Sequence, residues 1–238
     1  MNDRFPTTRP SLILAARAPE FRDEALAAIV EVYWKPVYKY LRLKWGRPHE
    51  DAQDLTQDFF AGLLDRDLLS RWEPVRASFR TYLRLCLDSH AANARSAELR
   101  LKRGGGAGNF VSLDFEAAER ELQLAASSAS SSPEELFHRE WQRRLFELGV
   151  SELKQVCEDP DRALQWKIFE AYDLTRDAEA RPGYEDLAAR HGIAVTTVTN
   201  YLAWARRELR RIVLDKLART TGTGAELRNE ARDLFSSR

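Results

Sequence analysis

Carboxylate side chains gather on one face of a helix that is predicted to begin near Asp51. Asp51, Asp54, Asp58 and Asp65 follow one another at steps of three, four and seven residues, with Gln57 beside them. Such steps bring side chains onto the same face of a helix. The aspartates could hold a divalent metal ion for nuclease or phosphatase chemistry, bind a basic protein, or form a solvated face. Because no histidine or glycine-rich loop accompanies them, we expect no enzyme activity, no metal and no cofactor.

Charge is segregated along the 238-residue chain, although its formal net charge is zero. Residues 50–67 hold six acidic residues and one basic residue, a net charge of −5. Residues 76–103 hold seven basic and two acidic residues, a net charge of +5, and residues 201–219 hold six basic and two acidic, a net charge of +4. Screening removes the influence of charges more than about 8–10 Å away, so a polyanion responds to these local patches. Two basic segments could therefore contact DNA, while the acidic segment contacts something else.

Hydrophobic spacing is helical throughout and no segment shows the alternation of a strand, so we expect an all-α fold. An apolar face over Leu26–Leu41 predicts a first helix, which Pro36 should kink or divide into two. No apolar run is long enough to span a bilayer, and no secretory leader opens the chain. Cys86 and Cys157 lack the spacing of a disulfide framework or a zinc site. We therefore expect a cytoplasmic protein that does not contact a membrane.

Composition predicts two small helical domains joined by a flexible linker. The expected parts are a first domain at 1–103, the linker at 104–132, a second domain at 133–220 and a short helical extension at 221–238. Glycine and serine runs flank the linker, and both compositions favour flexible coil. Ser132, Pro133 and Glu135 form the pattern of an N-cap, a first-turn proline and a capping box, which marks the start of a helix.

The stretch 184–213 has the spacing of a helix-turn-helix. A short helix ends at Gly192, with Ala188 at the expected helix crossing, and Val195 and Val198 occupy core positions of the next helix. The outward face of that helix carries short polar groups that can reach base edges, followed by arginines that can hold phosphates. These candidate DNA-binding residues are Thr196, Thr197, Thr199, Asn200, Ala203, Arg206, Arg207 and Arg210. A helical hairpin with a solvated polar face is the alternative.

A second basic surface is predicted on the helix that begins near Phe79 and on the loop before it. The helix candidates lie on two polar faces, with Ser89, Asn93, Ser96 and Arg100 on one and Arg80 and Arg84 on the other. The loop candidates are Arg71, Trp72 and Arg76. An aromatic side chain among basic ones suits unstacked single-stranded DNA, although Trp72 could instead belong to the core.

The order of these features resembles an extracytoplasmic-function sigma factor, a specificity subunit of bacterial RNA polymerase in the sigma-70 superfamily. Asp54-Leu55-x-Gln57-Asp58-x-Phe60 is similar to an element of the family's region 2.2. Phe79-Arg80-Thr81-Tyr82-Leu83 is similar to the start of the helix that carries regions 2.3 and 2.4, and Tyr184-Glu185-Asp186-Leu187-Ala188 to part of region 4.2. The resemblance spans about residues 25–213 and lies in order and spacing rather than in any one motif.

The resemblance implies that the protein binds core RNA polymerase and directs initiation at promoters. Asp51, Asp54, Gln57 and Asp58 would contact the clamp helices of the polymerase β′ subunit. The candidates of the basic helix and its loop would melt and read the −10 element, and the helix-turn-helix candidates would read the −35 element. The acidic linker residues Asp114, Glu116, Glu119 and Glu121 would mimic RNA charge where the family's linker follows the RNA exit path. Ala194 departs from the usual serine N-cap of the −35 helix, which forfeits about 1 kcal/mol of capping.

Two other functions fit parts of the sequence. A conventional helix-turn-helix regulator would bind palindromic sites as a dimer without polymerase, and a metal-dependent enzyme would use the clustered aspartates. After a flexible joint at 220–224, a short amphipathic helix is predicted from Leu227, Ala231, Leu234 and Phe235. This helix could cap the second domain, cover DNA-facing residues, or bind a regulatory partner such as an anti-sigma protein.

Overall fold

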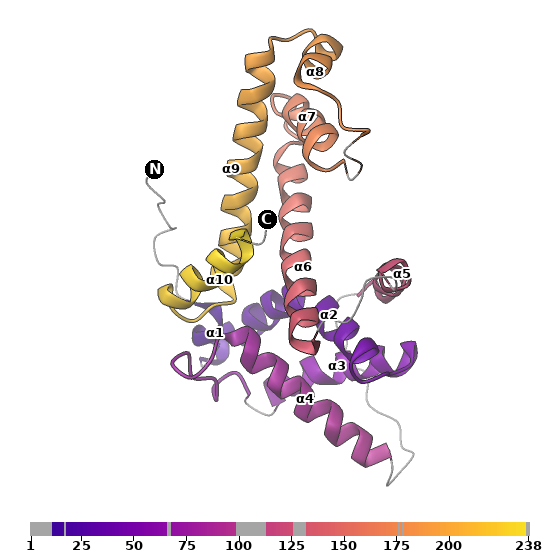
Figure 1. The fold of residues 1–238 in the computed structure, drawn as a ribbon. Coiled ribbons are helices and arrows are strands. Elements are labelled where there is room, and N and C mark those ends of the chain that lie inside the picture. The colour runs from indigo at the N-terminus through magenta and orange to yellow at the C-terminus, as the bar shows by residue number, and fades with distance from the viewer. Residues whose placement is uncertain are drawn as a thin grey trace. The chain divides into compact units, whose positions relative to one another are not determined.

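The computed structural model describes residues 11–16, 18–65, 68–98, 113–125, 132–175, 177 and 179–236, without the side chains of residues 64, 65, 96–98 and 125. Over these ranges the regular structure is helical and contains no strand, as the hydrophobic spacing predicts (Figure 1). The elements are α1 (Leu12–Ala15), a 3-10 turn η1 (Pro19–Phe21), α2 (Arg22–Leu43), α3 (His49–Asp65), α4 (Phe79–Glu98), α5 (Phe115–Ala125), α6 (Pro133–Val156), α7 (Ala163–Asp173), α8 (Tyr184–His191), α9 (Val195–Arg219) and α10 (Gly224–Ser236). None of the helices in these ranges combines the length and the apolar character needed to cross a bilayer.

Helix α2 continues through Pro36, so the expected division into two helices does not occur. A proline inside a helix removes one backbone hydrogen bond and crowds the preceding turn. Residues on either side of it, such as Tyr33, Val37 and Tyr38, are fully buried. Burial of this apolar helix face offsets the cost of the proline.

The structure divides into two compact units, of which the first comprises Met1–Leu145 together with Lys216–Arg238. Its core is aromatic, and the ring of Tyr33 packs against Phe79 at 5.8 Å and against Phe137 at 6.4 Å between centroids. Phe137 and the fully buried Trp141 come from the first turns of α6. The first unit therefore includes part of the segment that the sequence assigns to the second domain.

The second unit, Phe146–Asp215, is built around α7, α8 and most of α9. Its core joins Ile168 and Phe169 of α7 to Leu187 of α8 and to Val198 and Leu202 of α9. Val198 is a core position that the helix-turn-helix spacing predicts, and together these residues fix the relative position of α8 and α9.

The boundaries of these units differ from the predicted domain limits at 133 and 220 for a physical reason. The capping box at the start of α6 is present, because the Ser132 N–H donates to Glu135 Oε2 at 2.9 Å and the Glu135 N–H donates to Ser132 Oγ at 3.1 Å. Such a local signal marks where a helix begins but not which core it joins. Similarly, Thr220 and Thr221 are buried, at 1% and 5% exposure, rather than forming an exposed joint.

Candidate protein- and nucleic-acid-binding surfaces

The acidic face of α3 is open. Asp51 and Asp54 are exposed and Asp58 is half-buried, whereas Leu55 and Phe59, which directly follow Asp54 and Asp58, are buried. None of these three aspartates forms an ion pair within the ranges that the structure describes. Gln57 is half-buried beside them, and the side chain of Asp65 lies outside the described residues. Carboxylates left unpaired on a rigid helix are available to a basic partner.

Among the described residues, no group of three or more His, Cys, Asp or Glu side chains is close enough to hold a metal ion.

The loop before α4 is built around Trp72, whose indole is not available to a base. Trp72 is 1% exposed, its Nε1–H donates to the Ala77 carbonyl at 3.0 Å, and its ring packs edge-on against Phe79 at 5.2 Å between centroids. Trp72 thus lies in the core, the alternative that the sequence left open, and it anchors the loop. Arg71 and Arg76 are exposed, as expected.

Val75 is the most exposed large apolar side chain of this loop, at 98% exposure. Sequence reasoning missed it, since a single valine between Pro74 and Arg76 carries no periodic signal. An apolar group flanked by exposed arginines can contact the faces of unstacked bases, to which the arginines add phosphate contacts.

The arginines at the start of α4 are held inside the protein, contrary to the expectation that they are free for DNA. Arg80 Nη2 lies 3.1 Å from Glu230 Oε2, which makes an ion pair but not an aligned hydrogen bond. The Arg80 guanidinium also lies 4.4 Å from the centroid of the Trp141 ring. Arg84 Nη1 donates to Glu134 Oε1 at 2.8 Å and lies 3.3 Å from Asp88 Oδ2. Sequence spacing finds both arginines but not their acidic partners, which come from other helices or the next turn.

Further along α4 the predicted polar face is open. Ser89 and Asn93 are exposed, and Leu85 beside them is 51% exposed. Ser89 Oγ donates to the Leu85 carbonyl at 3.1 Å, so its lone pairs face outward. The side chain of Ser96 and the whole of Arg100 lie outside the described residues.

In the second unit, α8 and α9 are joined by a tight turn at Gly192. Gly192 has a φ of +65°, a left-handed conformation that glycine adopts without strain. The Ile193 N–H donates to the Ala188 carbonyl at 3.1 Å, which closes the end of α8. Ile193 packs against the core, whereas Val195 is 39% exposed. The expectation that Val195 is a core residue is thus corrected, because Ile193 already fills that side of the turn.

The outward face of α9 carries the predicted polar side chains. Thr196, Thr199, Asn200 and Arg207 are exposed, while Thr197, Ala203 and Arg210 are half-buried. Arg206 is exposed but forms a bidentate pair with Asp173, with Nε and Nη2 at 2.9 and 2.8 Å from its oxygens. A DNA phosphate would therefore compete with Asp173 for this arginine.

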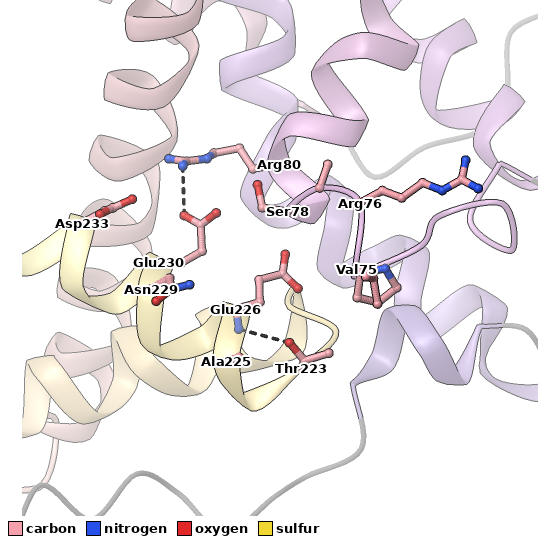
Figure 2. A pocket seen from close by; sticks show the side chains of 12 residues that line it. Val75, Arg76, Ser78, Arg80, Thr223, Ala225, Glu226, Asn229, Glu230 and Asp233 are labelled. Atoms are coloured by element: carbon pink, nitrogen blue, oxygen red, sulfur yellow. Dashed lines mark hydrogen bonds and ion pairs between the residues drawn. The ribbon is translucent and has the colours of Figure 1, made fainter.

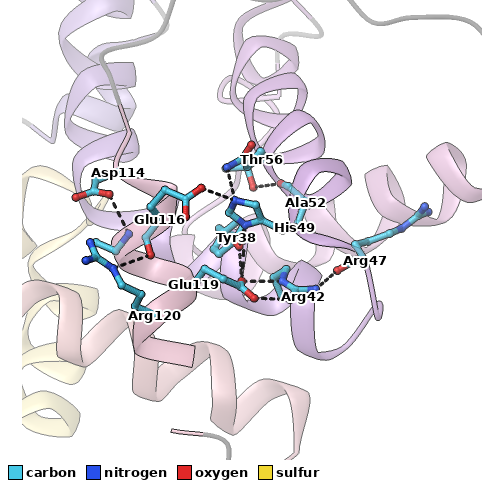
Figure 3. Close-up of polar contacts among 12 residues, drawn as sticks. Tyr38, Arg42, Arg47, His49, Ala52, Thr56, Asp114, Glu116, Glu119 and Arg120 are labelled. Atoms are coloured by element: carbon cyan, nitrogen blue, oxygen red, sulfur yellow. Dashed lines mark hydrogen bonds and ion pairs between the residues drawn. The ribbon is translucent and has the colours of Figure 1, made fainter. Parts of the chain in front are cut away.

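Helix α5, from the middle of the expected linker, packs on α2 (Figure 3). Glu119 receives hydrogen bonds from Arg42 at 2.5 and 2.8 Å and from the Tyr38 hydroxyl at 2.6 Å. Glu121 receives hydrogen bonds from Lys35 and Lys39, each at 2.8 Å. In this conformation the two glutamates are paired inside the first unit, and the expectation that they imitate RNA stays a prediction.

The other two acidic residues are Asp114, directly before α5, and Glu116 in its first turn. Asp114 caps the helix by accepting the Ala117 N–H at 2.9 Å, and Glu116 Oε1 lies 3.0 Å from His49 Nε2 at the start of α3. Both are exposed. Sequence composition finds a short acidic helix here but does not find its binding site on α2.

The described chain thus presents an unpaired acidic helix face, an exposed loop and helix with basic and polar groups, and a helix-turn-helix with a polar outward face. The first suits a basic protein surface and the other two suit nucleic acid. Comparisons with protein families, with curated proteins and with solved structures find no match to this chain.

Proposed function

We propose that this protein is a sigma factor of the extracytoplasmic-function type, which binds core RNA polymerase and directs it to promoters through −10 and −35 DNA. The observation that carries the proposal is the helix-turn-helix of the second unit. Its turn is closed by Gly192 in the left-handed conformation, and α9 exposes Thr196, Thr199 and Asn200 in its first two turns. Helices of this kind read base edges with their N-terminal residues.

The acidic face of α3 supports the polymerase-binding part of the proposal. Leu55 and Phe60 of the region 2.2-like motif are buried, while Asp54 is exposed and Asp58 is half-buried without an ion pair in the described ranges. The motif thus separates core residues from residues available to a partner. Two weak DNA contacts on one polymerase-bound protein act together, because the first contact raises the effective concentration of the second.

Binding to purified bacterial core RNA polymerase, measured by size-exclusion chromatography and titration, tests the proposal. The double variant Asp54→Lys with Asp58→Lys should lose at least about tenfold in affinity for core, since each reversal adds repulsion from a basic surface. Asp161→Lys with Glu170→Lys makes the same charge change at exposed positions of the second unit and should leave core binding unchanged.

Failure of the unaltered protein to co-elute with core polymerase would overturn the proposal. A protein that instead forms dimers and protects palindromic DNA without polymerase would be a conventional regulator. Urea unfolding of the α3 variant is the folding control, because α9 lies in the other unit and its DNA binding does not report on the fold of the first unit.

A further inference from the structure

The C-terminal helix α10 is part of the first unit and lies against the loop 71–78 and the start of α4 (Figure 2). Ala231 and Leu234 of α10 are buried. Two glutamates of the same helix are also buried, Glu226 at 9% and Glu230 at 5% exposure. Buried carboxylates are costly unless they are paired or hydrogen-bonded, so their partners indicate what the helix does.

Glu226 caps α4 from a distance of 147 residues along the chain. Its Oε1 accepts the backbone N–H of Phe79, the first residue of α4, at 2.6 Å, and its Oε2 accepts the Gly222 N–H at 2.7 Å. The first N–H groups of a helix lack partners within the helix, and negative charge is favourable there. One carboxylate thus ties the start of α4 to the segment that leads into α10.

Gly222 lies directly on the ring of Trp72. A Cβ atom at Gly222 would lie 2.3 Å from Cη2 of Trp72 and 3.0 Å from Cγ of Pro74, distances that require something to move. Phe79 packs edge-on against the same indole. The loop is therefore held between α4 and the chain that enters α10.

Arg80 adds a third connection, since it pairs with Glu230 and lies over the ring of Trp141. With α10 in place, Val75 is 98% exposed, and Arg71 and Arg76 are exposed as well. An open cavity of about 420 Å³ lies between the loop and α10, lined by Val75 and Arg76 on the loop and by Glu226 and Glu230 on the helix. Helix α10 thus contacts the loop and leaves Val75, Arg71 and Arg76 exposed.

If α10 only covered a DNA-binding indole, Trp72 would become exposed when α10 moved away. The Trp72 N–H is bonded to Ala77 within its own loop, and its ring is packed on Phe79. Lifting α10 would loosen this arrangement rather than present a ready base-binding surface. The contacts therefore favour a brace over a cover.

We infer that α10 is a brace that positions the loop 71–78 and the first turn of α4 for −10 DNA, with Glu226 and Gly222 as positioning residues. The DNA part of this inference rests on the proposed function. The brace itself is a property of the free protein and can be tested without DNA or polymerase.

The full-length variants Glu226→Ala and Gly222→Ala test the brace, with Gly224→Ala as the matched control. A Cβ at Gly224 meets only the end of Arg228, at 3.5 Å. Amide hydrogen exchange at Phe79 and in the loop should become about tenfold faster in both variants, since an unsatisfied N–H or a clash raises local opening. Exchange in α3 should stay unchanged, as should all exchange in the Gly224→Ala control.

The DNA arm uses holoenzyme and the labelled non-template strand of a promoter whose start site the protein specifies. Affinity for the −10 strand should fall about tenfold in both variants while binding to the −35 duplex is unchanged, which corresponds to the loss of about one positioning contact. If Glu226→Ala does not fold, Glu226→Gln keeps one acceptor oxygen and should show a smaller change in the same direction.

Tighter −10 binding by the variants would make α10 a cover and overturn the inference, as would unchanged exchange in the loop. Faster exchange throughout α3 would mean general destabilisation and would also overturn it. If no promoter responds to the protein, the proposed function falls, and the exchange measurement alone decides whether α10 braces the loop.

Discussion

Helices α5 and α10 both belong to the first unit, but Glu119 and Glu121 of α5 are held differently from Glu226 of α10. Glu119 and Glu121 of α5 are held by ion pairs with cationic side chains and keep partial exposure, at 14% and 21% for the side chains. Glu226 of α10 is buried and accepts backbone N–H groups. Charge pairs near the surface weaken with salt and acid, whereas caps and close packing do not depend on solution conditions in the same way. We therefore expect the contacts of Glu119 and Glu121 to weaken with salt and acid more than those of Glu226.

The pKa values of the carboxyl groups show the same contrast. Hydrogen bonds from Arg42 lower the pKa of Glu119 to about 2. Desolvation acts in the opposite direction on Glu121, but hydrogen bonds from Lys35 and Lys39 lower its pKa to about 2 as well. In α10, burial raises the pKa values of Glu226 and Glu230 above the ordinary glutamate value.

The substitution Gly222→Val should disrupt the packing of the α10 segment on Trp72 and have the largest effect on stability among these predictions. A branched side chain has no room against Trp72, and overpacking of this kind costs about 1–3 kcal/mol. Urea unfolding of the full-length protein, followed by fluorescence, measures the loss. Gly224→Ala should lie within about 0.5 kcal/mol of the original protein, and an equal loss in both variants would contradict the close contact at Gly222.

Acid should weaken the contacts of α5 but not those of α10, with a smaller effect on stability than the Gly222→Val substitution. A carboxyl group with a lowered pKa contributes stability above its ordinary pKa and loses it as the pH falls through its folded value, so the α5 contacts weaken from about pH 4.5 toward about pH 2. A raised pKa has the opposite effect on stability, because ionisation of the buried group costs stability as the pH rises through the ordinary value. Acid therefore relieves that cost for Glu226 and Glu230.

NMR amide signals of α5 and α10, followed through an acid titration, check this order. The Ala118 amide should shift toward a detached state before signals of α10 change, and Glu119→Gln with Glu121→Gln should already show that shift at neutral pH. Release of α10 before α5 would reverse the comparison.

Local signals in the sequence predict the helices well. The capping box at Ser132 and Glu135 and the turn at Gly192 depend on neighbours within a few residues, and both are present. The acidic face of α3 is predicted for the same reason, since helical spacing alone decides which side chains share a face.

Contacts between distant segments could not be predicted in this way. The apolar face of α6 does not say which core receives Phe137, and no spacing rule connects Glu226 to Phe79 or Glu230 to Arg80. The unpredicted positions of Arg80 and of α10 follow from these pairings. Arg80, an expected −10 contact, and the C-terminal helix, for which the sequence left several roles open, are parts of one packed cluster.

In vitro transcription with core polymerase on a library of genomic fragments tests the central claim most directly. A sigma factor would produce transcripts that depend on the added protein, and their start sites would share sequence elements near −10 and −35. Such transcripts should disappear with the Asp54→Lys and Asp58→Lys variant. The account would be contradicted if transcription is the same with and without the protein. It would be contradicted as well if neither the folded original protein nor the folded variant binds core polymerase.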